Sequence, residues 1–179
     1  MTVIKDQQLM LRVAKGDLDA FGELVRRHQR TAWRIAHRFL GDPAEAEDVV
    51  QEAFLRILAA APRYKPSAAF PTYLYRVVTR LCTDYSRKKR PIFTDSFPET
   101  VDPSPDPAAA LVNKRRDALI RKALDALPSR QRMVVILKYY EGLSYGDISR
   151  AMGTTVKAVE RLLDHARTTL QDSLSRTRK

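Results

Sequence analysis

The sequence predicts an all-α protein made of two small helical domains. Two observations predict this class. Apolar residues recur at helical spacing along most of the chain, and no segment has the alternating pattern of a strand or the turn signal of a hairpin. A third observation divides the chain. Residues 91–110 hold five of the ten prolines and four acidic residues but no Lys or Arg, which predicts an extended, flexible linker. We expect domains at 1–90 and 113–179 and an acidic, proline-rich linker at 91–112.

Composition limits the partners and the compartment. The chain has 179 residues, 44% of them hydrophobic, which suffices for a buried core, and a net charge of +11. An excess of basic residues in both predicted domains favours a polyanionic partner gripped at two places, although solvated surface charge can account for part of it. The single cysteine, Cys82, is expected as a buried thiol in a reducing compartment. No apolar run is long enough to insert into a membrane, so the sequence predicts a cytoplasmic protein.

Two helices are predicted before residue 62. The apolar residues of 19–41 follow a 3.6-residue period until Gly41, which ends the first helix. Asp42 is a candidate N-cap and Pro43 suits the first turn of the next helix, over 43–61, which ends at Pro62. The inward residues of the second helix are expected at Val49, Ala53, Phe54, Ile57 and Leu58.

The helix at 43–61 has an acidic surface. Asp42, Glu45, Glu47, Asp48 and Glu52 occur with no basic residue between Gly41 and Leu55. This surface repels phosphates, so a basic protein surface is its natural partner. Acidic residues near a helix N-terminus also favour the helix dipole and simply solvate the surface. Three of them, Glu45, Asp48 and Glu52, could also share one face as metal ligands. The chain has no Glu-x-x-His pair, however, and its histidines are isolated, so we predict no metal and no cofactor.

The helix starting at residue 70 has a basic second face. Its buried stripe is predicted at Leu74, Val77, Val78, Leu81, Cys82 and Tyr85. Another face carries Tyr73, Arg76, Arg80, Asp84, Arg87 and Lys88. Arginines along a helix can neutralise phosphates while an aromatic ring stacks on an unpaired base. The preceding loop adds Tyr64, Lys65 and Phe70, which could cradle such a base. A solvated basic face is the alternative.

The second domain contains a predicted helix-turn-helix. One amphipathic helix in "NKRRDALIRKALDAL" ends near Pro128, and another in "SRQRMVVILKYYEGL" ends near Gly142. Ser144 can cap a third helix, Gly153 supplies the positive φ of a sharp reversal, and Thr154 or Thr155 can cap the helix that follows. Two short helices joined by such a turn are typical of a helix-turn-helix, whose second helix enters the major groove of DNA. One helix with an internal glycine is the alternative.

The outer face of the last helix is the predicted reader of a duplex. Its inward residues are predicted at Val156, Val159, Leu162 and Leu163, which leaves Lys157, Glu160, Arg161, Asp164 and His165 outside, next to Thr155. Lys157 and Arg161 can donate to guanine edges or phosphates, and Glu160 can accept from a cytosine amine. Asp164 can pair with Arg161, read a cytosine, or repel a phosphate and so restrict docking.

Five segments in order resemble the extracytoplasmic-function (ECF) sigma factors, initiation subunits of bacterial RNA polymerase. They are "GDLDAFGELVRRH", "DPAEAEDVVQEAFLRIL", "FPTYLYRVVTRLCTDYSRKKR", "LDALPSRQRMVVILKYYEGLSYGDISRAMG" and "VKAVERLLDHAR". The resemblance implies binding of core polymerase through Asp48, Gln51, Glu52 and Leu55. It implies melting of the minus-ten promoter element by the segment that contains Tyr73, with bases captured by the preceding loop. The helix-turn-helix would then read the minus-thirty-five element, and the linker would thread towards the polymerase active-site cleft.

The resemblance also implies that the protein catalyses no reaction itself and that an anti-sigma factor clamps its two domains. Two positions depart from the family pattern. "LLDHAR" stands where family members often have "SRLxRAR", and Tyr73 stands where they often have tryptophan. A stand-alone helix-turn-helix regulator is the second hypothesis, but it does not explain the function of the acidic helix or of the aromatic-basic helix. A helical metal-dependent enzyme is the third.

Overall fold

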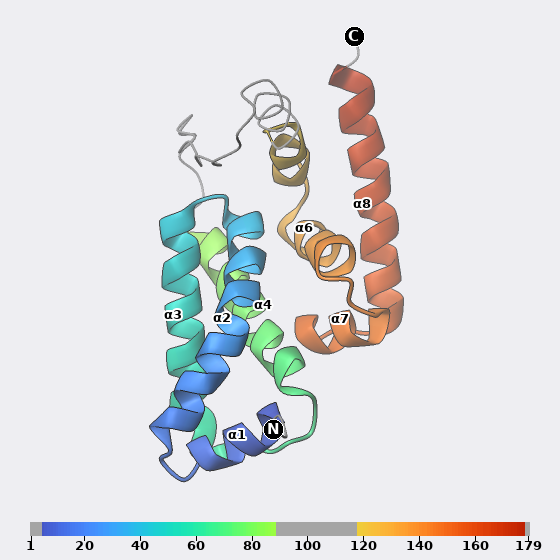
Figure 1. Cartoon of the computed structure of the whole chain (residues 1–179). Helices are drawn as coiled ribbons and strands as arrows, with labels where there is room; N and C mark the ends of the chain where they lie inside the picture. Colours follow the sequence, from blue (N-terminus) through green and yellow to red (C-terminus); the bar gives the residue numbers. More distant parts are fainter. Residues whose placement is uncertain (1–4, 89–117, 178–179) are drawn as a thin grey trace, which may run out of the picture.

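Every regular element in the described part of the chain is helical. The structure, a computed structural model, describes residues 5–88 and 118–177 (Figure 1). The first half contains α1 (Asp6–Val13), α2 (Leu18–Leu40), α3 (Pro43–Ala60), the short 3₁₀ helix η1 (Ala61–Arg63) and α4 (Phe70–Lys88). The second half contains a helical segment at 118–125, α6 (Ser129–Val135), the π-helical segment η2 (Ile136–Tyr140), α7 (Tyr145–Met152) and α8 (Val156–Thr177). The all-α prediction is confirmed, while the predicted linker at 91–112 lies outside the described residues.

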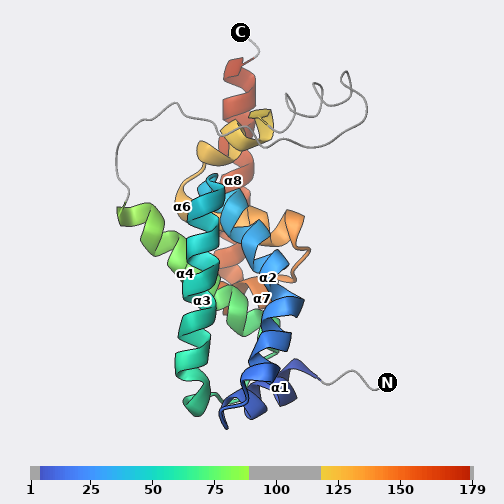
Figure 2. The same ribbon diagram turned by 60° about the vertical axis from the view of Figure 1, so that its left-hand side comes forward.

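The helices of the first half begin and end at the residues that the sequence singled out. Asp42 caps α3 by accepting a hydrogen bond from the Glu45 backbone N–H at 3.0 Å, and Gly41 ends α2 in the left-handed region at φ +84°. α2, α3 and α4 pack together around a core that includes Leu24, Phe39 and Ile57 (Figure 2). α1 packs across α2 and was not predicted, although its Leu9, Met10 and Val13 have the spacing of a buried helical face.

The helix predicted at 129–143 is divided in the structure. It begins as α6 and widens into η2, where the Glu141 N–H bonds to the Ile136 carbonyl five residues back. π-helical turns are rare and commonly occur at functional positions. This one determines where Tyr140 and Glu141 lie relative to α2, and nothing in the residue pattern had distinguished it from α-helix.

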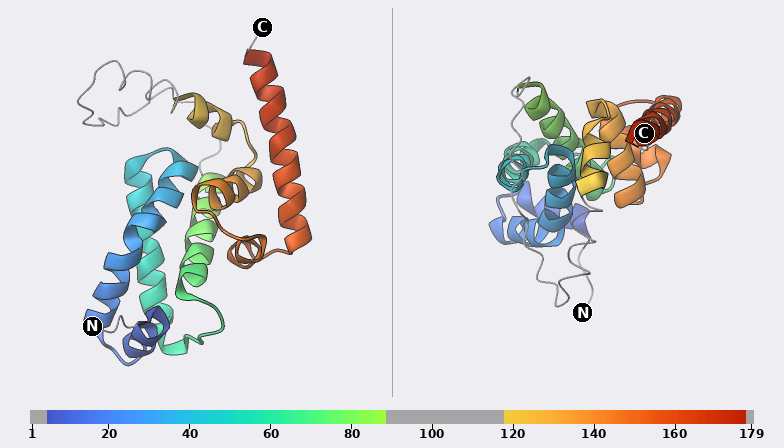
Figure 3. Two further views of the ribbon diagram at one scale, coloured as in Figure 1. Left: turned by 45° about the vertical axis from the view of Figure 1, so that its right-hand side comes forward. Right: turned by 90° about the horizontal axis from the view of Figure 1, so that it is seen from above.

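The two halves pack directly against each other through α4. One face of α4 contacts α2 and α3, and another contacts α7 and α6. In the left-hand view of Figure 3, α4 lies between the helices of the first half and α6–α7, while α8 lies at the far side. None of the described helices is long and apolar enough to cross a membrane.

Burial follows the predicted helical stripes with a few differences. In α4, Leu74, Val78, Leu81 and Cys82 are buried, while Val77 and Tyr85 are half-buried. In α8, Val159 and Leu163 are buried as expected and Leu162 is half-buried. The inward position predicted for Val156 is wrong because its side chain is 43% exposed. This residue starts the helix, ahead of the turn that packs on the rest of the domain.

Gly41 should tolerate a side chain less well than Gly16, although both glycines have positive φ. A Cβ at Gly41 would lie 2.0 Å from Nη2 of Arg121, whereas Gly16, at φ +91°, has nothing within 4 Å of that position. The left-handed backbone costs an L-residue about 1–2 kcal/mol at either site. We expect Gly41→Ala to lower the free energy of unfolding by about 1 kcal/mol more than Gly16→Ala, because it also displaces hydrogen bonds of Arg121. Urea denaturation measures both, and equal losses would contradict the steric argument.

Cys82 should be inert in the folded protein. Burial raises the pKa of its thiol from 9.0 to about 12, so at pH 8 almost none of it is the reactive thiolate. We expect no alkylation by iodoacetamide in the native protein and full alkylation in guanidinium, as measured by mass spectrometry. The variant Ala59→Cys, at an exposed position of α3, is the reactive control, and native modification of Cys82 at the rate of that introduced thiol would refute the prediction.

Candidate nucleic-acid and protein interfaces

α7, a tight turn and α8 form the helix-turn-helix that the sequence predicted. Ser144 caps α7 by accepting from the Asp147 N–H at 3.1 Å, and Gly153 ends it at φ +60°. The Thr154 N–H then bonds to the Ser149 carbonyl at 2.9 Å, which closes the turn. Of the two candidate caps for α8, Thr155 serves, because its Oγ1 accepts from the Ala158 N–H at 3.2 Å.

The predicted reading residues share one exposed face of α8. Lys157, Glu160, Arg161, Asp164 and His165 are all exposed, at steps of three and four along the helix. The partner of Asp164 within the protein is Arg167, at 3.1 Å. Arg167 in turn donates to the Tyr139 hydroxyl at 3.2 Å, which ties the helix to η2. The structure therefore pairs Asp164 with Arg167 and not with Arg161. Arg161 is exposed on the same face of α8.

The basic face predicted on α4 is present in the structure. Arg76, Arg80, Arg87 and Lys88 are exposed, and Tyr73 at the start of the helix is half-buried. Because α4 turns its other faces to the first-half core and to α7, this surface is the one that remains available to a ligand. Its spacing matches a row of cations that can follow a phosphate backbone.

Phe70 does not join this surface. Its side chain is 1% exposed, and its ring lies 5.1 Å from the His28 ring and 6.5 Å from the Tyr73 ring, measured between centroids. The prediction that Phe70 cradles a base is wrong for this structure, because the ring fills the core beneath the loop. Lys65 is exposed and Tyr64 half-buried. The rings of Tyr64 and Tyr73 lie 5.7 Å apart, and burial raises the pKa of both phenols.

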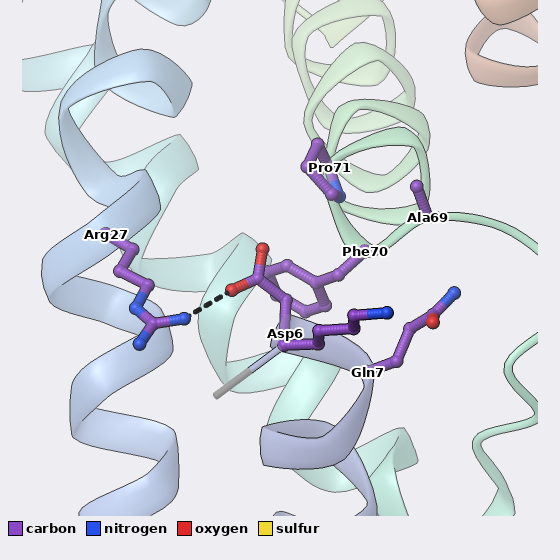
Figure 4. A pocket seen from close by; sticks show the side chains of 7 residues that line it. Asp6, Gln7, Arg27, Ala69, Phe70 and Pro71 are labelled. Carbon is purple, nitrogen blue, oxygen red and sulfur yellow. Dashed lines mark hydrogen bonds and ion pairs between the residues drawn. The ribbon is translucent and has the colours of Figure 1, made fainter. Parts of the chain in front are cut away.

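α1, which the sequence analysis missed, holds the loop before α4 in place. Gln7 donates to the Ala68 carbonyl at 3.3 Å. Asp6 accepts from Arg27 at 2.9 Å and lies 2.8 Å from Nε2 of His28. Figure 4 shows Asp6, Gln7 and Arg27 at an open pocket of ≈ 360 Å³ between α1, α2 and the start of α4. The start of the basic helix is thus positioned by the N-terminal helix.

The acidic helix α3 presents a mixed acidic and apolar face. Asp48, Gln51 and Leu55 are exposed, Leu55 to 60%. Glu52 is half-exposed and pairs with Arg56 one turn later at 2.6 Å. An exposed leucine one turn after Glu52 and two turns after Asp48 suits a protein interface, because the apolar side chain gains by being covered and the carboxylates favour a basic partner.

The carboxylates of α3 do not form a metal centre. Among residues 5–88 and 118–177, no three His, Cys, Asp or Glu side chains come together in an arrangement that could hold a metal ion. Glu45, Asp48 and Glu52 are carboxylates of α3.

Comparison with protein families separates the same two halves of the chain. Residues 24–92 match Sigma-70 region 2, and residues 117–170 match the family described as Sigma-70, region 4. The first match contains α3 and α4, and the second contains the helix-turn-helix.

Curated relatives match almost the whole chain. It is 31% identical to the RNA polymerase sigma-H factor of Pseudomonas aeruginosa, over 97% of this chain and 96% of that protein. It is 30% identical to the ECF RNA polymerase sigma factor SigW of Bacillus subtilis, over 91% and 93%. It is 33% identical to the ECF RNA polymerase sigma factor SigE of Mycolicibacterium smegmatis, over 91% of this chain but 66% of that longer protein.

A solved structure has the same fold. CnrH, solved in complex with the cytosolic domain of CnrY, superposes with a TM-score of 0.72 and 28% identity over 95% of this chain and 97% of CnrH. The Bartonella quintana sigma factor RpoE, solved with the anti-sigma factor NepR, shares the fold at a TM-score of 0.66 and 19% identity, over 87% of this chain and 96% of RpoE. With both domain matches and near full-length relatives in agreement, this chain belongs to the ECF family of RNA polymerase sigma factors.

Proposed function

We propose that this ECF sigma factor binds core RNA polymerase through the exposed face of α3 and contacts promoter DNA through α4 and α8. In this scheme residues 1–90 act as region 2, residues 113–179 act as region 4, and residues 91–112 link them. The polymerase supplies the chemistry of RNA synthesis, and this chain supplies recognition and strand separation.

The observation that carries the proposal is the segregation of charge between neighbouring helices. α3 exposes carboxylates around Leu55, while α4 exposes four cations along one face. A surface like that of α3 is repelled by phosphates, so one small domain offers one face suited to a protein and another suited to nucleic acid. A DNA-binding protein that acts alone has no need of the first face.

Single-stranded promoter DNA is the proposed ligand of α4 and the loop before it. Arg76, Arg80, Arg87 and Lys88 would neutralise phosphates, and Tyr73 would stack on a base at the edge of the melted region. Tyr64 and Lys65 lie in the adjoining loop and would receive an unpaired base. Unstacking costs a few kcal/mol per base step, which stacking on the tyrosines and phosphate contacts would offset.

Duplex DNA at the minus-thirty-five element is the proposed ligand of α8. The recognition helix of this motif lies in the major groove and its N-terminal residues reach the base edges. Lys157 and Arg161 would donate to guanines or phosphates, Glu160 would accept from a cytosine, and His165 would lie towards the backbone. Asp164 is held by Arg167, so its charge is partly compensated. Thr155 is a cap whose hydroxyl is already engaged.

An anti-sigma factor is the proposed regulator. CnrH, which has the same fold at 28% identity, was solved with the cytosolic domain of CnrY. A protein that covers α3 or the DNA-binding faces would prevent assembly with the polymerase or the promoter.

Co-purification with bacterial core polymerase, followed by transcription from a pool of random promoter-length duplexes, tests the proposal. Transcripts that appear only with this chain and share an upstream and a downstream motif are the expected result. Failure to bind core polymerase, with tight retention of one duplex by the protein alone, would instead identify a stand-alone regulator.

Reversing the charge of Glu52 should weaken polymerase binding. Glu52→Lys places a cation next to Arg56 in the middle of the α3 face, and we expect at least a tenfold loss of affinity for core polymerase, since mismatched charge at an interface costs several kcal/mol. Asp172→Lys makes the same charge change at an exposed position of α8 and should bind normally. Circular dichroism checks the fold, and equal affinities for the two variants would remove α3 from the interface.

Removing the Arg161 side chain should relax selectivity at the upstream element. A bidentate contact to a base contributes about 1–3 kcal/mol of discrimination, so Arg161→Ala should lower the preference for the best upstream sequence by about fivefold or more. Arg150→Ala, in α7, removes an exposed cation of the same motif and should weaken binding to all sequences alike. Unaltered base preference of Arg161→Ala in the selection experiment would exclude Arg161 from the reading residues.

A further inference from the structure

The contact between the two halves of the chain contains more specific polar interactions than an incidental packing surface needs. We call it the clasp. It comprises α2 residues 34–41 on one side and, on the other, Arg121, Arg132, Tyr140 and Glu141. Each side supplies charged side chains and an aromatic ring. The interactions meet at the C-terminal end of α2, where a helix normally ends in solvent.

Two arginines of the second half bind the last carbonyls of α2. Arg121 donates to the Arg38 carbonyl at 2.9 Å and to the His37 carbonyl at 3.3 Å, and Arg132 donates to the Phe39 carbonyl at 2.9 Å. The His37 carbonyl also accepts from the Gly41 N–H at 2.8 Å. All three carbonyls lie in the last turn of α2, at the negative end of the helix dipole, so cations bind well there. The absence of a side chain at Gly41 is what lets Arg121 approach.

Both arginines are themselves fixed within the second half. Asp125 lies 3.1 Å from the Arg121 guanidinium and 3.2 Å from that of Arg132. Arg132 also donates to the Asp125 carbonyl at 3.1 Å. Across the clasp, its guanidinium lies over the Phe39 ring of α2, 5.5 Å from the ring centre. Because the guanidinium groups are held in place before they meet α2, less conformational entropy is lost on closing.

Glu141 is the counterpart at the other side of the clasp. Its side chain is only 5% exposed and lies 3.3 Å from Arg34 and 3.6 Å from Arg38, both in α2. Its Oε1 atom has no hydrogen-bond partner, so the ion pairs are the main compensation for burying the charge. The Arg38 guanidinium also lies 4.5 Å from the centre of the Tyr140 ring. Separating the halves would return Glu141 to water, and burying it without both arginines would be unfavourable.

The closed arrangement keeps the two proposed DNA-binding helices close together. α7 packs on α4, and α8 packs on α7, as the left-hand view of Figure 3 shows. Packed helix axes lie 8–10 Å apart, so where they pack on α7 the axes of α4 and α8 are at most about 20 Å apart. Promoter elements centred at minus ten and minus thirty-five are separated by about 25 base pairs, or about 85 Å of duplex at 3.4 Å per pair. The closed chain therefore cannot occupy both.

We propose that the clasp is an autoinhibitory contact that holds the isolated chain closed and must open before the chain can engage a promoter. The exposed face of α3 remains accessible in the closed form, so polymerase can bind first and opening can follow. The inhibitory role rests on the proposed function, whereas the existence of a closed state in solution does not.

A distance measurement on the isolated full chain tests the closed state. Spin labels at Ala59→Cys in α3 and Thr168→Cys in α8, both exposed positions, report the separation of the halves, because buried Cys82 does not react. We expect a narrow distance distribution for the otherwise unchanged chain. Glu141→Arg places a third cation between Arg34 and Arg38 and should give a broad, longer distribution. Asp172→Arg, outside the clasp, should leave it narrow.

Charge exchange separates the clasp from general damage. Adding Arg34→Glu and Arg38→Glu to Glu141→Arg recreates the opposite pairing and should restore the narrow distribution. Unchanged helix content by circular dichroism shows that each opened variant is still folded. A broad distribution in the unchanged chain, or a narrow one in Glu141→Arg, would overturn the proposal.

A reversible lock tests the inhibitory role. The hydroxyls of Ser86 in α4 and Ser129 in α6 lie 3.4 Å apart across the same interface, so Ser86→Cys with Ser129→Cys can form a disulfide there. The oxidised variant should still bind core polymerase, but its promoter-dependent transcription should fall at least tenfold. Adding a reductant should restore transcription. Each single substitution is the control. Equal transcription in both redox states would overturn the inhibitory role, and absence of transcription from the unsubstituted chain would count against the proposed function instead.

Discussion

The C-terminal turn of α2 is the constraint on which the arrangement of the other helices depends. Its carbonyls need partners, and they receive them from Arg121 and Arg132 of the second half. Its arginines need a counter-charge, and Glu141 supplies it. Because helix ends can be satisfied by water as well, this association gains specificity from its geometry at a modest gain in free energy. A specific contact of modest free energy can be broken when the chain engages a promoter, as the proposed clasp requires.

Around this joint the surfaces are divided by charge. α3 presents carboxylates and Leu55, α4 presents cations, and α8 presents a mixed polar row. The contact between the halves involves other faces of α4 and the end of α2. It leaves the α3 face and the exposed rows of α4 and α8 uncovered. A single short chain can therefore keep a protein-binding face and two nucleic-acid-binding faces exposed while its halves are closed.

Local sequence signals accounted for where most helices start and stop. Asp42, Ser144 and Thr155 cap helices because a side-chain oxygen two or three residues ahead of a free N–H is a local interaction. Gly41 and Gly153 end helices because glycine adopts positive φ at little cost. The exposed row of α8 followed from helical periodicity. α1 carried the same kind of signal in Leu9, Met10 and Val13 and could have been found by it.

The sequence by itself determined the helical class, the caps, the charge of each face and the family, because these depend on neighbouring residues or on segments read in order. Only the tertiary structure decided that Phe70 is core, that Asp164 pairs with Arg167, that residues 136–140 widen into a π-helical turn and that Glu141 is buried between Arg34 and Arg38. The burial of Phe70 and of Glu141 depends on residues brought together from distant parts of the chain, whereas Asp164 and Arg167 are three residues apart in α8 and residues 136–140 are consecutive. Spacing along a sequence specifies which face of a helix a side chain occupies, but the packing of other helices determines what that face meets.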